Sequence, residues 1–335
     1  MSCSLVTHHS SLSMPLWQHY HRPTTVAEAL ALLARYDGRA RLISGGTDLL
    51  LEMQQGHRRP VEALVDVTAI GEMTGIGEKD GYVEVGAAVT HTQIVESALI
   101  VGQATCLVES CGVIGGPQVR NVATLGGNVA HALPAADGTT ALVALDAEAE
   151  VATLDGRAWR PILNLFRGAG ESAVDPTREL ISRFRWPAAL PGAASAYKRI
   201  MRPQGVALPI LACAVWVCLK GNEGTEGTKS EEGNWPSKIQ NPKSKIADVR
   251  ICLGPVRPIP CRATEAEAAL RGRSLDEGLA DCVAAAQVEF SPRASKHRAT
   301  AEYRREMIAV LLQRALPLAV ERAITGQIVP EGVGL

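Results

Sequence analysis

The sequence predicts an α+β fold, in which helices and strands alternate but several strands are spaced as hairpins. Helical and strand patterns follow one another through the first half of the chain. Beyond Pro176 the residue pattern changes from alternating helices and strands to four successive strand-like runs, at 180–186, 196–200, 210–220 and 246–253. The 335 residues are enough for two or three domains with a sizeable core.

The N-terminal part opens with a well-signalled helix. Thr25 and Glu28 form a capping-box pair ahead of apolar residues at helical spacing, and Asp37-Gly38 ends the helix. A second capping box, Thr90 with Gln93, begins another helix. Around these helices, strands are predicted at 40–43, 63–67, 82–87 and 149–154, and helices at 139–145, after Thr264, after Ser274 and at 294–324.

One segment is predicted not to fold. Residues 221–245, between two strand-like runs, contain Gly, Ser, Glu and Lys with almost nothing apolar. Such a composition cannot bury enough surface to offset the entropy cost of ordering the chain. We therefore expect a long disordered hairpin loop there.

Charge and composition exclude several function classes. Lys plus Arg number 34 and Asp plus Glu 35, so the net charge of −1 offers no electrostatic footprint for nucleic acid or an anionic membrane. No apolar run approaches the ~20 residues that span a bilayer, and the N-terminus lacks a secretory pattern, so we expect a cytoplasmic protein without a membrane span. The eight cysteines form no C-x-x-C pair, and we expect no metal site.

Two glycine pairs carry the strongest signal for ligand binding. The first lies in Ser44-Gly45-Gly46-Thr47-Asp48, directly after a strand, and the second in Thr124-Leu125-Gly126-Gly127-Asn128. Adjacent glycines remove two Cβ atoms and let successive backbone N–H groups converge on an oxyanion. Two such loops on opposite sides of a ligand would suit a diphosphate. We expect backbone amides of both loops, rather than a basic patch, to hold it.

Other interpretations of these residues stay open at this point. A single Gly-Gly after a strand is often an ordinary turn. The Walker A lysine is absent, since Asp48 follows Thr47, and no G-x-G-x-x-G follows an early strand. Asp137 is either a helix N-cap or an acceptor for a ribose or an adenine amine, and His131 is more often a polar surface residue than a base.

No catalytic constellation can be assembled from the sequence. It contains no G-x-S-x-G, no H-E-x-x-H and no convincing carboxylate pair. A redox enzyme that leaves its chemistry to a flavin needs binding and orientation more than titrating side chains. We therefore predict no catalytic residue in this chain.

The glycine loops and their surroundings resemble the FAD-binding medium subunit of the molybdenum hydroxylases, the xanthine dehydrogenase and carbon monoxide dehydrogenase family. The resemblance rests on 44–49, on 118–128 and on Pro134-Ala135-Ala136-Asp137. It continues through 20–23, 195–199 and 301–305, and so covers nearly the whole chain.

The resemblance implies which residues contact FAD. The two glycine loops would hold the diphosphate, with Asp137 on the adenosine side. Ile114 would pack on the isoalloxazine, Ile181 would lie near the ring, and Lys198 would tune the flavin electrostatically. The full set is Leu42, Ile43, Ser44, Gly45, Gly46, Thr47, Asp48, Leu49, Ile114, Thr124, Leu125, Gly126, Gly127, Asn128, His131, Asp137, Ile181 and Lys198.

The resemblance also implies the domain plan. We expect a p-cresol methylhydroxylase-type FAD-binding domain of two α/β subdomains, followed by a smaller α+β C-terminal domain with a terminal helix. The predicted limits are a disordered N-terminus at 1–14, the FAD-binding domain at 15–172 with a break near 60–70, the C-terminal domain at 176–290 and a helical tail at 291–335.

The implied function is an electron relay. A substrate would be hydroxylated in a large molybdopterin-binding partner, and electrons would pass through a small iron–sulfur (2Fe-2S) partner to FAD and then to NAD or another acceptor. Two alternatives remain: a stand-alone FAD-dependent oxidoreductase, for which no acid or base candidate is found, and a flavin-free assembly module, against which the intact glycine pairs argue.

Overall fold

The computed structural model describes residues 15–202, 208–220, 244–295 and 298–332. The predicted disordered segments, 1–14 and most of 221–245, lie outside these residues. Ser244 and Lys245, the last two residues of the predicted loop, are described. Lys220 N donates to Lys245 O at 2.8 Å, so this end of the predicted loop already belongs to the adjoining sheet.

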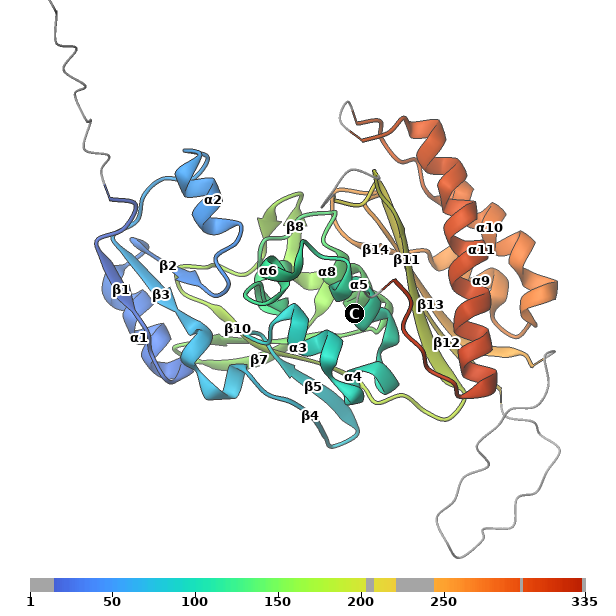
Figure 1. Ribbon diagram of the computed structural model, residues 1–335, viewed down its shortest axis with the longest axis horizontal. Helices are drawn as coiled ribbons and strands as arrows, with labels where there is room; N and C mark the ends of the chain where they lie inside the picture. The colour runs from blue at the N-terminus through green and yellow to red at the C-terminus, as the bar shows by residue number, and fades with distance from the viewer. Residues whose placement is uncertain (1–14, 203–207, 221–243, 296–297, 333–335) are drawn as a thin grey trace, which may run out of the picture.

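Three main sheets follow one another along the molecule (Figure 1). The first is parallel, with the order β1-β3-β2, and the second and third are antiparallel, with the orders β4-β5-β10-β6-β7 and β11-β12-β13-β14. The strands are β1 His19–His21, β2 Ala40–Ile43, β3 Ala63–Asp66, β4 Ile76–Lys79, β5 Tyr82–Gly86, β6 Glu148–Thr153, β7 Gly156–Pro161, β8 Phe166–Gly168, β9 Glu171–Ser172, β10 Leu180–Pro187, β11 Ala193–Ile200, β12 Leu211–Leu219, β13 Ile246–Gly254 and β14 Cys261–Arg262.

The helices cover these sheets, and their starts agree with the capping signals in the sequence. Thr25 caps α1 through the backbone N–H of Glu28, and Thr90 with Gln93 forms the predicted capping box of α3. The helices are α1 Val26–Tyr36, α2 Leu49–Gln54, α3 His91–Glu96, α4 Ala98–Gln103, α5 Thr105–Gly112, α6 Pro117–Arg120, α7 Leu125–Ala130, α8 Asp137–Ala144, α9 Thr264–Leu270, α10 Leu275–Glu289 and α11 Ala301–Thr325.

Strand β10 belongs to the second sheet, although the sequence analysis assigned it to the C-terminal domain. It pairs with β5 on one side and with β6 on the other, so it is the central strand of that sheet. The partner strands are distant in sequence, and a sequence pattern alone does not specify such pairing. From the sheet pairing we propose a domain boundary after β10, whereas the sequence analysis placed it between 172 and 176.

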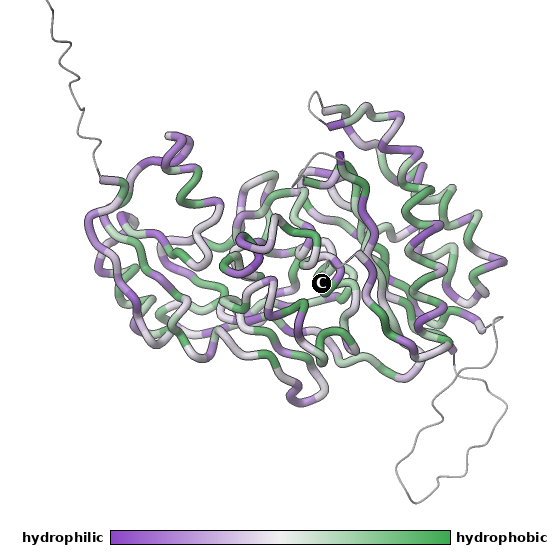
Figure 2. The backbone as a smooth tube through the Cα atoms, in the orientation of Figure 1, coloured by the Kyte–Doolittle hydropathy of each residue, from purple (hydrophilic) through white to green (hydrophobic). Residues whose placement is uncertain are grey.

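The third sheet lies between two hydrophobic cores. Helices α5 and α8 pack on one of its faces, and α11 packs on the other (Figure 1). Along β12, Ala212 and Ala214 join the core of the first two sheets, whereas Leu211, Cys213 and Val215 join the core under α11. Figure 2 shows apolar and polar residues alternating along α11, as expected for a helix with one buried face.

No helix in the described part of the chain is long and apolar enough to span a bilayer.

Candidate functional site

The first glycine loop joins β2 to α2 and lies against the second loop. Gly46 has a φ of +68°, a conformation that favours glycine. A Cβ on Gly45 would lie 2.2 Å from Val122 O and 2.6 Å from Ala123 Cα, so the close approach of the two backbones requires glycine here. Within the described residues, the N–H groups of Gly45, Gly46 and Thr47 make no hydrogen bond. They are available to an anion.

The second glycine loop begins α7 and is hydrogen bonded to the first. The Thr124 side chain accepts from Gly127 N at 3.2 Å and donates to Ser44 Oγ at 3.1 Å. A Cβ on Gly126 would lie 2.6 Å from Ala87 O, so this glycine too allows close packing. The predicted meeting of the two glycine pairs is confirmed.

The amides of the second pair are already engaged, which corrects the expectation that both loops offer free N–H groups. Gly126 N donates to Ala87 O at 2.8 Å, Gly127 N to Thr124 Oγ1, and Asn128 N to Thr124 O at 3.0 Å. The second pair therefore brings the backbone of α7 close to its neighbours, and the first pair presents the unpaired amides.

Two adjoining cavities open at these loops, one of about 440 Å³ and one of about 160 Å³. Both are lined by Leu42, Ile43, Ser44, Gly127, Ala130 and Pro176, so they adjoin where β2 leads into the first loop. The larger cavity has the size of a typical ligand site. Of the predicted residues, it is lined by Leu42, Ile43, Ser44, Gly45, Gly46, Thr47, Asp48, Leu49, Ile114, Thr124, Gly127, Asn128, His131 and Asp137.

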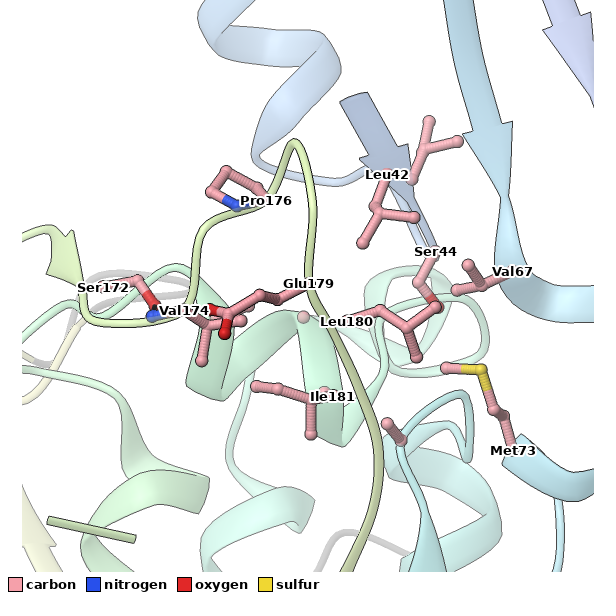
Figure 3. Close-up of a pocket in the computed structure, with 15 residues that line it drawn as sticks. Leu42, Ser44, Val67, Met73, Ser172, Val174, Pro176, Glu179, Leu180 and Ile181 are labelled. Atoms are coloured by element: carbon pink, nitrogen blue, oxygen red, sulfur yellow. Dashed lines mark hydrogen bonds between the residues drawn. The ribbon is translucent and has the colours of Figure 1, made fainter. Parts of the chain in front are cut away.

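The smaller cavity is mostly apolar. Figure 3 shows Leu42, Val67, Met73, Leu180 and Ile181 around it, contributed by the first sheet, the segment that follows it and β10. Because β10 reaches this cavity from the second sheet, the cavity lies at the junction of the first two sheets.

A buried ion pair lies on the wall of the larger cavity. Arg199 Nη1, from β11, contacts the two carboxylate oxygens of Asp137 at 3.3 and 3.2 Å, and the Tyr197 hydroxyl donates to the same carboxylate. Burial raises the pKa of Asp137 to about 6, although Arg199 and Tyr197 both oppose that shift. Asp137 is the first residue of α8 and Ala136 is its N-cap, so the N-cap interpretation of Asp137 is wrong.

A second charged group lines the same cavity near α2. Glu52 accepts from Arg58 Nε at 2.8 Å and lies 3.6 Å from His131 Nε2. Arg41 also lines the cavity, and its burial lowers the pKa of its guanidinium. The sequence analysis missed these two arginines, because each looks like an ordinary surface residue until the fold places it beside the glycine loop.

His91 is a further cavity residue that the sequence did not indicate. It is 1% exposed and lines the larger cavity, and its Nδ1 has no hydrogen-bond partner. Burial, with a smaller effect of the nearby Arg120, lowers the pKa of His91 to about 4. The ring is therefore neutral at pH 7.

Four predicted residues do not line the larger cavity. Gly126 and Ile181 line the smaller one, so Ile114 and Ile181 line different cavities. Leu125 is fully buried in the core. Lys198 lines neither cavity and pairs with the Glu331 carboxylate, because alternate residues of β11 face opposite sides of the sheet. Of these two cations of β11, Arg199 lies at the cavity and Lys198 does not.

A metal ion needs a group of ligating side chains placed together. Among the residues that the structure describes, no group of three His, Cys, Asp or Glu side chains is placed to hold a metal ion. The described cysteines are free, and burial raises the pKa of Cys106, for example, to about 12.

Comparisons with known proteins agree with this arrangement. Residues 13–189 match the family described as the FAD binding domain in molybdopterin dehydrogenase, and residues 195–319 match the CO dehydrogenase flavoprotein C-terminal domain. The carbon monoxide dehydrogenase medium chain of Afipia carboxidovorans is 30% identical over 91% of this chain and 97% of its own length. The xanthine dehydrogenase FAD-binding subunit of Escherichia coli O157:H7 is 26% identical over 91% and 96%.

A solved structure gives the same result. The carbon monoxide dehydrogenase of Hydrogenophaga pseudoflava matches with a TM-score of 0.80 and 29% identity, over 93% of this chain and 99% of that one. The predicted α+β class, with an FAD-binding domain followed by a C-terminal domain that ends in a helix, is confirmed. The chain therefore belongs to the FAD-binding medium subunits of the molybdenum hydroxylase family and is an oxidoreductase component whose cofactor is FAD.

Proposed function

We propose that this chain is the electron-transfer subunit of a cytoplasmic molybdenum hydroxylase. It would receive electrons from a small 2Fe-2S partner, which draws them from a large molybdopterin-binding partner, and pass them on to NAD or another acceptor. The names of its relatives, medium chain and FAD-binding subunit, are those of parts of larger enzymes, which supports the two partners.

The observation that carries the proposal is the meeting of the two glycine loops beside adjoining cavities. The unpaired N–H groups of Gly45, Gly46 and Thr47 suit the diphosphate of FAD. Arg41 and Arg58 line the same cavity and add positive charge near it. A dinucleotide has a group to place at each end of its diphosphate, and two cavities adjoin where Leu42, Ile43 and Ser44 lead into this loop.

We place the two ends of FAD by size and polarity. The smaller, apolar cavity at Ile181 suits the flat purine of the adenosine. The larger cavity, at Ile114 and the Asp137–Arg199 pair, suits the ribityl chain and the isoalloxazine. This placement puts Asp137 on the flavin side, whereas the resemblance implied the adenosine side.

In this proposal the residues of the chain bind and orient FAD, and FAD supplies the redox chemistry. Bound FAD accepts electrons singly and releases them as a pair. Asp137, held by Arg199 and Tyr197, fixes the wall at one end of the larger cavity. In the described chain, the groups that line this cavity include no paired nucleophile and base, which favours a relay over a stand-alone oxidoreductase.

The test uses the full chain, alone and co-expressed with its two partner subunits. We expect the complex to carry FAD, iron and molybdenum, and NADH to bleach the flavin and then the iron–sulfur absorbance if NAD is the acceptor. Bleaching by an artificial donor without transfer to the cluster would overturn the relay. Turnover by the chain alone would identify a stand-alone oxidoreductase, and a complex without flavin an assembly module.

A further inference from the structure

His91 is held firmly in the wall of the larger cavity. It is the first residue of α3, and its backbone N–H donates to Ala123 O at 3.0 Å, next to the second glycine loop. The Thr90–Gln93 capping box fixes the start of the same helix. Ile114 and Thr124 line the cavity beside it. The imidazole therefore has a defined position between the glycine loops and Ile114.

One nitrogen of the imidazole ring is buried and has no hydrogen-bond partner among the described residues. An unpaired buried polar atom such as this Nδ1 is costly. Arg120 does not supply the bond, because its Nη1 donates to Ile114 O at 3.3 Å and to Gly115 O at 3.0 Å. Within the described residues, Nδ1 has no partner, and the ring to which it belongs lines the larger cavity.

A neutral imidazole offers one N–H donor and one acceptor nitrogen. A hydroxyl group can donate to the acceptor nitrogen or accept from the N–H, so it suits the cavity-facing nitrogen in either tautomer, whereas a phosphate oxygen only accepts. We propose that His91 hydrogen bonds a sugar hydroxyl of FAD adjoining the diphosphate. This inference rests on the proposed placement of FAD in the two cavities. The hydroxyl belongs either to the ribityl chain or to the ribose, and the experiment distinguishes them.

The test measures how fast FAD leaves the loaded protein. Release is followed by the recovery of FAD fluorescence after dilution, so no turnover is needed. We expect His91→Phe, which fills the space without a polar atom, to speed release roughly three- to tenfold, the value of one hydrogen bond. His91→Gln, which keeps a donor and an acceptor, should recover part of the loss. The exposed His57→Phe serves as the matched control.

The outcomes separate this inference from the proposed function. If Gly45→Ala abolishes FAD binding but His91→Phe releases FAD within twofold of the wild type, the role of His91 is overturned alone. If neither change affects FAD, the placement of FAD fails as well. Should His91→Phe fold poorly by circular dichroism, His91→Leu, which also lacks a polar atom, takes its place. Release of FAD from that variant at the wild-type rate would overturn the role of His91.

Two further ligands identify the hydroxyl. Weaker riboflavin binding by His91→Phe points to the ribityl chain. Unchanged riboflavin binding together with weaker competition by ADP points to the ribose. If neither ligand distinguishes the variant from the wild type, the proposed hydrogen bond does not exist.

Discussion

At the scale of single residues, Gly45 is the position of the site where an added side chain has the least room. Its Cβ would overlap Val122 O at 2.2 Å, and backbone on both sides cannot give way cheaply. We predict that Gly45→Ala separates the two glycine loops, destabilises the protein by about 1–3 kcal/mol and weakens FAD binding at least tenfold. Flavin fluorescence titration and urea unfolding measure both effects.

Gly102 in α4 is the matched control for that change. A Cβ there would meet nothing within 4 Å, so Gly102→Ala should leave FAD binding unchanged and stabilise the protein by up to about 1 kcal/mol. Normal FAD binding by Gly45→Ala would contradict the close contact between the loops.

His91 makes stability depend on pH. Its folded pKa of about 4 lies below the 6.5 of an exposed histidine, so between these values the unfolded chain takes up a proton that the folded chain refuses. Stability should therefore fall as the pH drops from 6.5 to 4, by roughly 3 kcal/mol in all. Asp137, with its pKa raised to about 6, acts in the opposite direction.

The difference between His91→Phe and the wild type isolates the histidine. We predict that, when the pH is lowered from 7 to 4, the unfolding free energy of the variant rises by about 3 kcal/mol relative to that of the wild type. Urea unfolding at each pH measures this difference. A difference that stays constant with pH would show that the imidazole is not held neutral.

Lys198 and Arg199 are neighbours in β11, and the alternation of side chains along the strand decides which of them reaches the cavity. The sequence marks 196–200 as a strand, but the resemblance singled out Lys198. In the structure Tyr197 and Arg199 face Asp137, and Lys198 faces the other way. The strand could be predicted from the sequence, but the face it turns to the cavity depends on contacts with α8, more than fifty residues away.

At the scale of elements, Thr124 stabilises both the start of α7 and the contact between the two glycine loops. It is the N-cap of α7 through Gly127 N, and it donates to Ser44 of the other loop. We predict that Thr124→Val, similar in shape but without the hydroxyl, costs about 1–2 kcal/mol in unfolding free energy. Ser44→Ala should cost less, because it removes only the bond between the loops.

A double-mutant cycle tests whether the two side chains act together. If the bond between the loops is real, Ser44→Ala combined with Thr124→Val should cost less than the two separate losses added together. Strict additivity would mean that Thr124 acts only as a helix cap.

Local signals predicted the elements well, and long-range pairing explains what they could not predict. Thr25 and Thr90 cap their helices as expected, because a cap needs only a few consecutive residues. The box of Thr90 with Gln93 is complete, whereas the Glu28 carboxylate accepts from Thr24 N instead of Thr25 N. The place of β10 between β5 and β6 depends on strands that lie far apart in the sequence. The same pairing puts Ile181 at the smaller cavity, away from Ile114.

At the scale of the whole molecule, a buried ion pair connects the two parts of the chain. Glu109 in α5 accepts from Arg322 Nη2 of α11 at 2.6 Å, and both side chains are almost fully buried. The second carboxylate oxygen of Glu109 accepts from Tyr197 N at 2.7 Å, and Arg322 also donates to Ser195 O at 2.9 Å. These contacts hold β11, which carries Arg199 to the cavity, against both helices.

Removing one member of this pair should destabilise the protein more than removing both. Arg322→Met leaves the Glu109 carboxylate buried without its positive partner, and we predict a loss of about 3–5 kcal/mol in urea unfolding. Glu109→Gln together with Arg322→Met should recover much of that loss, because no unpaired charge stays buried. Arg305→Met, at an exposed position of the same helix, should change stability by less than about 0.5 kcal/mol. If Arg322→Met unfolds like Arg305→Met, the pair does not connect the two parts, and the position of β11 must depend on its pairing with β12, its contacts with Asp137 and apolar packing.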